Sequence, residues 1–236
     1  MDRYKTSQLN ILIADLRNIP AQNTDDPLAI PNIASMRPES VLARRLVAIA
    51  LGAFLGRVPT RKELALESRP DRGKPYFPAF PDFHYNISHS GDYVVCAVSD
   101  HPVGIDLQKI NDNAERCLKI AKRFFSEEEQ NALRELLPDS ENTENPVGSS
   151  DFCDRSASLP FCTYFTRCWT AREAYIKLTG RGLAEPFESF RPDLNAKRIL
   201  VRDSDDVFLL ECEAPPGYCM SVCSYKEKNG PVITKY

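Results

Sequence analysis

Glu173 and Lys177 are the residues of this sequence whose types and spacing point most directly to chemistry. They lie four residues apart, so on a helix a carboxylate and an ammonium group would stand one turn apart on one face. Gly180 and Gly182 follow, and glycine suits a left-handed helix end and a close backbone approach. Such a segment can hold a metal ion beside an anionic group. The alternative is a solvated ion pair without a chemical role.

The helix that must carry this pair is indicated by a second, apolar stripe. Trp169 lies four residues before Glu173 and so shares its face. Steps of four and three residues define the apolar side, which consists of Tyr164, Cys168, Ala171, Tyr175 and Leu178. The two stripes predict an amphipathic helix with its candidate site on the polar face.

Asp106 is a second acidic candidate, far upstream in the segment Gly-Ile-Asp-Leu-Gln-Lys. A short strand is predicted over residues 103–107, with Asp106 near its end and Gly104 allowing close approach. Magnesium takes oxygen ligands and commonly uses one or two protein carboxylates plus substrate phosphate. Asp106 and Glu173 would supply these two carboxylates. A strand-end aspartate that caps a turn is the alternative.

Two further segments suit an anionic ligand. Residues 86–92, Asn-Ile-Ser-His-Ser-Gly-Asp, are predicted to form a turn whose N–H and hydroxyl groups bind an anion. Ser88 beside His89 is poor evidence for a hydrolase, because no Gly-x-Ser-x-Gly elbow accompanies them. Lys74 lies in a rigid Gly-Lys-Pro turn at residues 73–75 and suits a phosphate, with an ordinary surface turn as the alternative.

The elements around these segments follow from periodicity and turn residues. Helices are predicted over 40–55, from a Thr60/Glu63 capping box, over 113–137 with a new start at a Ser126/Glu129 capping box, and around Glu173. Strands are predicted over 11–16, 83–88, 93–98, 103–107, at 201, over 207–210 and over 220–224. Residues 138–160 are polar and predicted to be a flexible loop. Strands mixed with separate helices indicate an α+β fold with antiparallel sheets.

Composition limits the function classes. The 236 residues can form one large domain or two similar halves. A net charge of −3 gives no general attraction to nucleic acid or anionic membranes, and no apolar run approaches the roughly 20 residues of a membrane helix. Residues 1–10 lack a signal-peptide core, and the eight cysteines show no zinc-finger spacing. We therefore expect a cytoplasmic protein with reduced thiols.

Five segments in order make the chain similar to the surfactin-type (Sfp-type) 4′-phosphopantetheinyl transferases. That family carries Gly-Lys-Pro, an Asn-x-Ser-His-Ser-Gly-like segment, Gly-Ile-Asp-x-Glu, Arg-Phe-Phe-Ser-x-x-Glu and Trp-Ser/Thr-x-Lys/Arg-Glu-Ala-x-x-Lys-x-x-Gly-x-Gly-Leu. The corresponding segments here are residues 73–75, 86–91, 104–109, 123–129 and 169–183. Each segment is modest evidence, but the shared order makes a chance match very unlikely.

The resemblance implies a fold and a reaction. The fold would be a pseudo-twofold pair of similar α+β halves, 1–104 and 105–236, each with an antiparallel sheet packed against a long helix. Coenzyme A and Mg²⁺, with Mn²⁺ as a possible substitute, would bind in the cleft between the halves. The 4′-phosphopantetheine of coenzyme A would pass to a serine of an apo acyl or peptidyl carrier protein, releasing adenosine 3′,5′-bisphosphate. A monomer is expected.

The resemblance also implies residue roles. Asp106 and Glu173 would bind the metal, with Gln108 acting through water, and Glu173 would also take the serine proton. Lys177 would neutralise the transferred phosphate, and Glu129 matches an acidic position near the metal. Contacts to coenzyme A are expected from Arg37, Lys74, Ser88, His89 and Lys177.

One departure keeps other readings open. Gln108 stands where the family has a second acidic residue, so the chain could be a coenzyme A-binding homologue with impaired catalysis. A magnesium-dependent nucleotide pyrophosphohydrolase would need a dense acidic cluster, for which residues 127–129 are the one candidate; the helix dipole explains these more simply. Which carrier protein and pathway are served, among fatty acid, polyketide and nonribosomal peptide synthesis, stays open.

Overall fold

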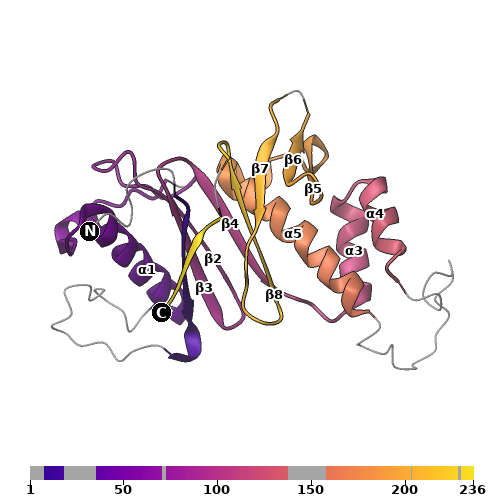
Figure 1. Cartoon of the computed structure of the whole chain (residues 1–236), viewed down its shortest axis with the longest axis horizontal. Helices are drawn as coiled ribbons and strands as arrows, with labels where there is room; N and C mark the ends of the chain where they lie inside the picture. Colours follow the sequence, from indigo (N-terminus) through magenta and orange to yellow (C-terminus); the bar gives the residue numbers. More distant parts are fainter. Residues whose placement is uncertain (1–7, 19–35, 71–72, 138–157, 203, 228–229) are drawn as a thin grey trace.

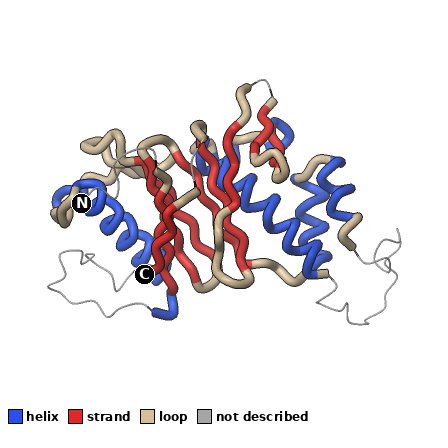
Figure 2. Tube along the Cα trace, viewed as in Figure 1, coloured by secondary structure: helices blue, strands red, loops and turns tan. Residues whose placement is uncertain are grey.

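The structure is a computed structural model that describes residues 8–18, 36–70, 73–137, 158–202, 204–227 and 230–236. Four layers follow one another across the molecule: a long helix, a sheet, a second sheet and another long helix (Figure 1). The outer layers are α1 (Pro38–Leu55) and α5 (Leu159–Thr179). Figure 2 shows the strands gathered between these helices. The predicted mixed α+β class is confirmed at this level.

The first sheet has the strand order β2-β3-β1-β9. Its strands are β2 (His84–Ser90), β3 (Tyr93–Ser99), β1 (Asn10–Asp15) and β9 (Val232–Lys235). Neighbours pair antiparallel except β1 and β9, which are parallel. The prediction of antiparallel sheets is therefore wrong for this pair. A long connection through the second sheet brings the chain back beside β1, so no hairpin constrains its direction.

Helix α1 covers the outer face of the first sheet. It begins two residues before the predicted start, because proline at Pro38 is compatible with the first helical turn. Gly56 ends it in the left-handed region at φ 69°. The apolar face of α1 packs on one face of the sheet, and this core includes Leu42, Leu46, Ala50, Leu51, Leu12, Val94 and Cys96. A short helix α2 (Arg61–Ala65) follows with the predicted Thr60/Glu63 capping box.

The second sheet is antiparallel throughout, in the order β4-β8-β7-β6-β5. Its strands are β4 (Val103–Lys109), β8 (Tyr218–Ser224), β7 (Val207–Glu211), β6 (Arg198–Val201) and β5 (Phe190–Asp193). Helix α5 packs on its outer face through a core that includes Ala171, Ala174, Leu178, Ile199, Leu209 and Cys223. Of the stripe predicted for α5, Ala171, Tyr175 and Leu178 meet this sheet, whereas Tyr164 and Cys168 belong to a separate core that includes residues of α3 and α4.

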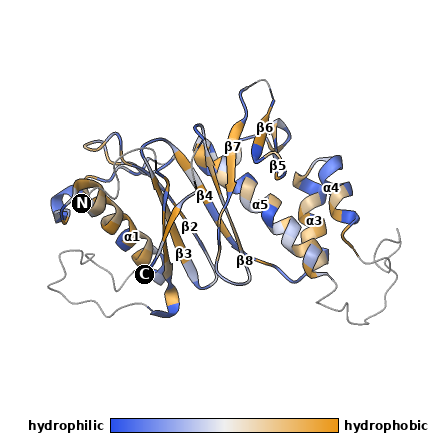
Figure 3. Ribbon diagram, in the orientation of Figure 1, coloured by the Kyte–Doolittle hydropathy of each residue, from blue (hydrophilic) through white to orange (hydrophobic). Residues whose placement is uncertain are grey.

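A third apolar core joins the two sheets face to face. It combines alternate residues of both, including Ile11, Ile13, Val95, Ala97, Ile105, Leu107, Met220 and Val222. The central strands are coloured largely as hydrophobic in Figure 3, as expected for strands buried on both faces. This sandwich fixes the position of β4 beneath α5.

Two helices pack on the first half of α5: α3 (Ala114–Phe124) and α4 (Glu127–Arg134). The predicted helix 113–137 is therefore two helices, separated at Phe125 and Ser126. The predicted restart is confirmed, because Ser126 and Glu129 form a capping box. Short 3₁₀ helices complete the description at Leu16–Asn18, Gly182–Ala184 and Phe187–Ser189.

Two sequence expectations concern boundaries along the chain, and a third concerns membrane-spanning helices. The loop predicted over 138–160 lies outside the described residues except for its last three, of which Leu159 and Pro160 open α5. The proposed division into 1–104 and 105–236 cuts within β4 and stays a prediction. Within the described ranges, none of the helices combines the length and the apolar character that a bilayer crossing requires.

Candidate active site

Asp106 lies in the interior of β4, not near its end as predicted. The strand continues to Lys109 because it keeps pairing with β8, where Ser221 is the residue opposite Asp106. Alternation along β4 turns Ile105 and Leu107 into the core between the sheets. The carboxylate of Asp106 therefore faces the other way, and the residue is only 2% exposed.

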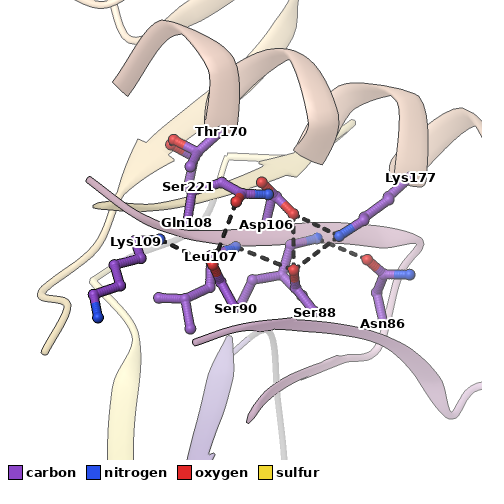
Figure 4. Close-up of polar contacts among 11 residues, drawn as sticks. Asn86, Ser88, Ser90, Asp106, Leu107, Gln108, Lys109, Thr170, Lys177 and Ser221 are labelled. Atoms are coloured by element: carbon purple, nitrogen blue, oxygen red, sulfur yellow. Dashed lines mark hydrogen bonds and ion pairs between the residues drawn. The ribbon is translucent and has the colours of Figure 1, made fainter. Parts of the chain in front are cut away.

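One oxygen of Asp106 is bound by two side chains from distant elements (Figure 4). Lys177 Nζ, from α5, donates to Asp106 Oδ1 at 2.6 Å, and Ser88 Oγ, from β2, donates to the same atom at 2.7 Å. Lys177 Nζ also donates to Ser88 Oγ at 2.9 Å. Asp106 Oδ2 is buried and has no hydrogen-bond partner among the described residues. A carboxylate is thus held at one oxygen while the other stays available to a ligand.

Glu173 completes the cluster from α5, one turn before Lys177. Burial and the nearby carboxylate of Asp106 raise the pKa of Glu173, and the ammonium of Lys177 opposes this shift. The buried Asp106 Oδ2 and the half-buried Glu173 are oxygen donors of the kind that Mg²⁺ prefers. Two carboxylates are also the number that Mg²⁺ commonly takes from a protein, so these residues fit that ion.

Gln108 lies two residues beyond Asp106 on the same side of β4. Ser90 Oγ donates to Gln108 Oε1 at 3.3 Å. In the described part of the chain no group of three or more His, Cys, Asp or Glu side chains is arranged to hold a metal ion. The position of the second acidic residue in the family's Asp-x-Glu segment is occupied here by the neutral amide of Gln108.

The segment Asn86–Ser90 is part of strand β2, in line with the strand predicted over 83–88, so the turn predicted over 86–92 is confined to its last two residues. The actual turn is at Gly91 and Asp92, because residues 84–90 all pair with β3. His89 is exposed, whereas Ser88 is buried.

Alternate β2 side chains instead bind the free edge of β4, as Figure 4 shows for the two strands. Backbone N–H groups of β4 donate to Asn86 Oδ1 at 2.9 Å, Ser88 Oγ at 3.2 Å and Ser90 Oγ at 3.0 Å. The donors are the amides of Ile105, Leu107 and Lys109. This side-chain ladder joins the edges of the two sheets.

Lys74 lies beside the C-terminal end of α5, next to Gly180. Its Nζ donates to the backbone oxygen of Val103 at 2.5 Å. Burial lowers the pKa of Lys74 to about 8. The residue therefore reaches the start of β4, three residues from Asp106, without entering the Asp106–Lys177 cluster.

A pocket of about 350 Å³ opens between the first turns of α1 and the segment that carries Lys74. Arg44 and Arg69 line it, although nothing in the sequence singled them out. Helical spacing could have indicated Arg44 from the sequence, because Ser40 and Arg44 are one turn apart on α1 and both line the pocket. Arg37, the sequence candidate in this region, is exposed and lies 3.3 Å from Glu39.

The structure does not bring Glu129 to the Asp106–Glu173 cluster. Glu129 is buried, and its Oε2 accepts from Arg172 Nη2 at 2.5 Å and from the backbone N–H of Ser126 at 2.8 Å. Arg172 is 1% exposed and its guanidinium lies over the ring of Phe125. The pair ties α4 to α5 in the core.

These features define an α+β protein with a two-carboxylate site between α5 and the adjoining edges of its sheets. Residues 102–223 match the family described as the 4′-phosphopantetheinyl transferase superfamily. The chain belongs to that superfamily.

Individual relatives agree with this assignment. The chain is 35% identical over 161 residues to the 4′-phosphopantetheinyl transferase Sfp of Bacillus subtilis (strain 168), covering 66% of this chain and 62% of the relative. It is 32% identical over 206 residues to the 4′-phosphopantetheinyl transferase gsp of Aneurinibacillus migulanus, covering 82% and 76%. A further Bacillus subtilis 4′-phosphopantetheinyl transferase is 35% identical over 156 residues. The matched part of the chain spans 59% and 62% of the lengths of the two Bacillus subtilis relatives.

Proposed function

We propose that the chain transfers the 4′-phosphopantetheine of coenzyme A to a serine hydroxyl of an apo acyl or peptidyl carrier protein. Adenosine 3′,5′-bisphosphate is the other product. The observation that carries the proposal is the buried Asp106 Oδ2, which lacks a hydrogen-bond partner in the described part of the chain. Burial and the nearby carboxylate of Asp106 raise the pKa of Glu173, which supports a second carboxylate in the same site. Membership of the superfamily supports the same reaction.

Mg²⁺, or Mn²⁺ in its place, would be held by Asp106 through Oδ2 and by Glu173, with the Gln108 amide acting through a water. When bound, the ion supplies positive charge that polarises the pyrophosphate of coenzyme A and stabilises the departing nucleotide. The neutral Gln108 leaves the protein one negative charge short of the Asp-x-Glu members of the family. We expect weaker metal binding as a result.

The other steps of the proposed reaction depend on side chains of the protein. Glu173 accepts the proton of the carrier serine, directly or through a water, as a general base. Lys177 offsets negative charge on the transferred phosphate, as preorganised cations do in phosphoryl-group transfer. The hydrogen bond between Lys177 and Asp106 holds the two groups in a fixed relative position for this step. Glu129 is proposed to have a structural role, because its bond to Arg172 holds α4 against α5.

Coenzyme A is proposed to occupy the pocket beside α1. Arg44 and Arg69 line this pocket, and Arg69 is paired with Glu67, with Nε 2.5 Å from Oε2. Lys74 is the neighbour in sequence of Pro75, which lines the pocket, and Arg37 lies at the start of α1. His89, the other sequence candidate, is exposed on β2. Anionic phosphates are the groups that this set of cations suits.

Finer features of the family are part of the same proposal. The outer placement of α1 on one sheet and α5 on the other supports two similar halves related by a pseudo-twofold axis. A monomeric state and a cytoplasmic location stay predictions from the sequence.

A catalytically impaired coenzyme A-binding homologue is the second candidate, and Gln108 is the observation that favours it. A pyrophosphohydrolase is not favoured. Its acidic candidates Glu127 and Glu128 are exposed on α4, and Glu129 is bound to Arg172.

Intact-mass measurement tests the proposal. The protein would be incubated with coenzyme A, Mg²⁺ and a panel of apo carrier proteins drawn from fatty acid, polyketide and nonribosomal peptide systems. A mass gain of one phosphopantetheine unit that disappears with a chelator supports the transferase. Binding of coenzyme A without any mass gain favours the binding homologue, and cleavage of coenzyme A without an acceptor favours the hydrolase.

A further inference from the structure

Ser88 uses its whole hydrogen-bonding capacity inside the protein. A serine hydroxyl has one donor hydrogen and two acceptor lone pairs. The hydrogen goes to Asp106 Oδ1, while Oγ accepts from the backbone N–H of Leu107 and from Lys177 Nζ. The residue is 4% exposed. No donor or acceptor of Ser88 is left for a ligand.

The three hydrogen-bond partners of Ser88 come from two other elements, β4 and α5. Leu107 and Asp106 belong to β4, and Lys177 belongs to α5, whereas Ser88 itself belongs to β2 of the other sheet. The other two members of the β2 ladder, Asn86 and Ser90, bind β4 amides but make no bond to Asp106. Among the three β2 residues, Ser88 is therefore the one that binds both the backbone of β4 and the carboxylate of Asp106.

The hydrogen bonds to Oδ1 also decide which oxygen of Asp106 remains available to bind a metal ion. With Oδ1 accepting from Ser88 and Lys177, rotation of the carboxylate would break two short hydrogen bonds, at 2.7 and 2.6 Å. Oδ2 is buried without a hydrogen-bond partner in the described chain, and so keeps one direction. A ligand that is oriented by a neighbouring group in this way binds metal more tightly than one that is free to rotate.

We propose that Ser88 is a positioning residue that makes Asp106 a single-oxygen metal ligand through Oδ2, and that it does not contact coenzyme A. This inference rests on the proposed function in that the ion is taken to be the divalent cation of the transfer reaction. It gives the Asn-x-Ser-x-Ser pattern of β2 a mechanical reason: the strand is hydrogen-bonded to the edge of β4 at every second residue, and the middle serine also aligns the metal ligand.

Direct binding measurements on the full chain test this. Mn²⁺ would be titrated into wild type and Ser88→Ala and the free ion followed by electron paramagnetic resonance. Coenzyme A binding would be measured separately by calorimetry with EDTA present. For Ser88→Ala we expect the Kd for Mn²⁺ to rise roughly 10–100-fold, while the Kd for coenzyme A changes by less than about twofold. Ser88→Thr, which keeps the hydroxyl, should recover most of the Mn²⁺ affinity.

Ser221→Ala is the matched control. Ser221 is the Cα partner of Asp106 on β8 and is also buried, but its hydroxyl lies 2.9 Å from Thr170 Oγ1 and not against a carboxylate. It removes the same group from the neighbouring strand and should leave Mn²⁺ affinity unchanged. Equal loss of Mn²⁺ affinity in both variants would show a general packing effect and overturn the proposal. So would a Ser88→Ala variant with unchanged Mn²⁺ affinity, or one that loses coenzyme A instead.

The outcome does not depend on turnover. If wild type binds Mn²⁺ and Ser88→Ala does so weakly, the positioning role stands even when no carrier protein is modified. If carriers are modified but Ser88→Ala binds Mn²⁺ normally, the transferase stands and the positioning role fails.

Discussion

Arg172 and Glu173 are consecutive residues of α5 that belong to two separate charge systems. Arg172 is bound to Glu129 on the side of α4, at 2.5 Å, and is almost fully buried. Glu173 is half-buried, and its pKa is raised by burial and by Asp106, while Lys177 opposes the shift. Successive helix residues point about 100° apart, so one helix can present a core ion pair and a reactive carboxylate to different neighbours.

Breaking the first system should cost stability and spare the site. Glu129→Gln leaves the buried guanidinium of Arg172 without its counter-charge, so we expect a loss of about 3–5 kcal/mol in the free energy of unfolding. Urea denaturation measures this, and Mn²⁺ titration of the folded variant should give the wild-type affinity. Normal stability combined with lost Mn²⁺ binding would instead return Glu129 to the metal site, as the family resemblance implied.

Glu173→Gln should remove most transfer activity. The variant loses both a metal ligand and the proposed base, and a general base contributes about 10²–10⁴-fold in rate. Coenzyme A affinity measured without metal should be unchanged, because the pocket is lined by other residues. Glu188→Gln is the control, since Glu188 is an exposed glutamate shortly after α5. Near-normal turnover in Glu173→Gln would refute the assignment of this residue.

Lys177→Met should destabilise the metal-free protein. Asp106 is 2% exposed and would keep only Ser88 as a donor to Oδ1, so we expect a cost of roughly 1–3 kcal/mol. Added Mg²⁺ should restore part of this stability by supplying positive charge at the same carboxylate. Thermal unfolding with and without Mg²⁺ measures both effects. Lys119→Met, at an exposed pair with Glu115, should change little, and an equal loss there would argue against a specific role for Lys177.

Gln108→Glu should strengthen metal binding and weaken the metal-free fold. The substitution adds a third negative charge beside Asp106 and Glu173, which attracts a divalent cation and repels the existing carboxylates. Calorimetric titration with Mg²⁺ and thermal unfolding in EDTA should therefore move in opposite directions. Unchanged Mg²⁺ affinity would mean that the side chain at position 108 does not reach the ion.

Lys74 predicts a pH dependence of stability. Burial lowers its pKa from the ordinary 10.5 to about 8, so the folded protein holds this proton less tightly than the unfolded chain does. Below pH 8 the folded state bears the cost of a buried ammonium group, and that cost is relieved as the pH rises from about 8 towards 10.5. Wild type should thus gain stability relative to Lys74→Met over this range. A constant difference between the two proteins from pH 7 to about 10 would contradict the shifted pKa.

The sequence by itself determined what depends on neighbouring residues. The capping boxes at Thr60/Glu63 and Ser126/Glu129 formed as predicted, because such caps involve residues only three apart. Helical spacing put Glu173 and Lys177 on one face of α5, apart from its apolar stripe. The motifs were also sufficient to indicate the superfamily, since they can be recognised without knowing where they lie in space.

Only the tertiary structure decided the contacts that make the site. Lys177 and Asp106 are 71 residues apart, and Ser88 lies 89 residues from Lys177, so no local pattern reports that they meet. The same holds for Glu129, whose partner Arg172 is 43 residues away. This ion pair keeps Glu129 in the core and not at the metal site that the resemblance implied. The length of β4 and the parallel β9 followed from pairing with distant strands. Periodicity describes how the backbone repeats locally, whereas these positions depend on which surfaces pack together once the two sheets have met.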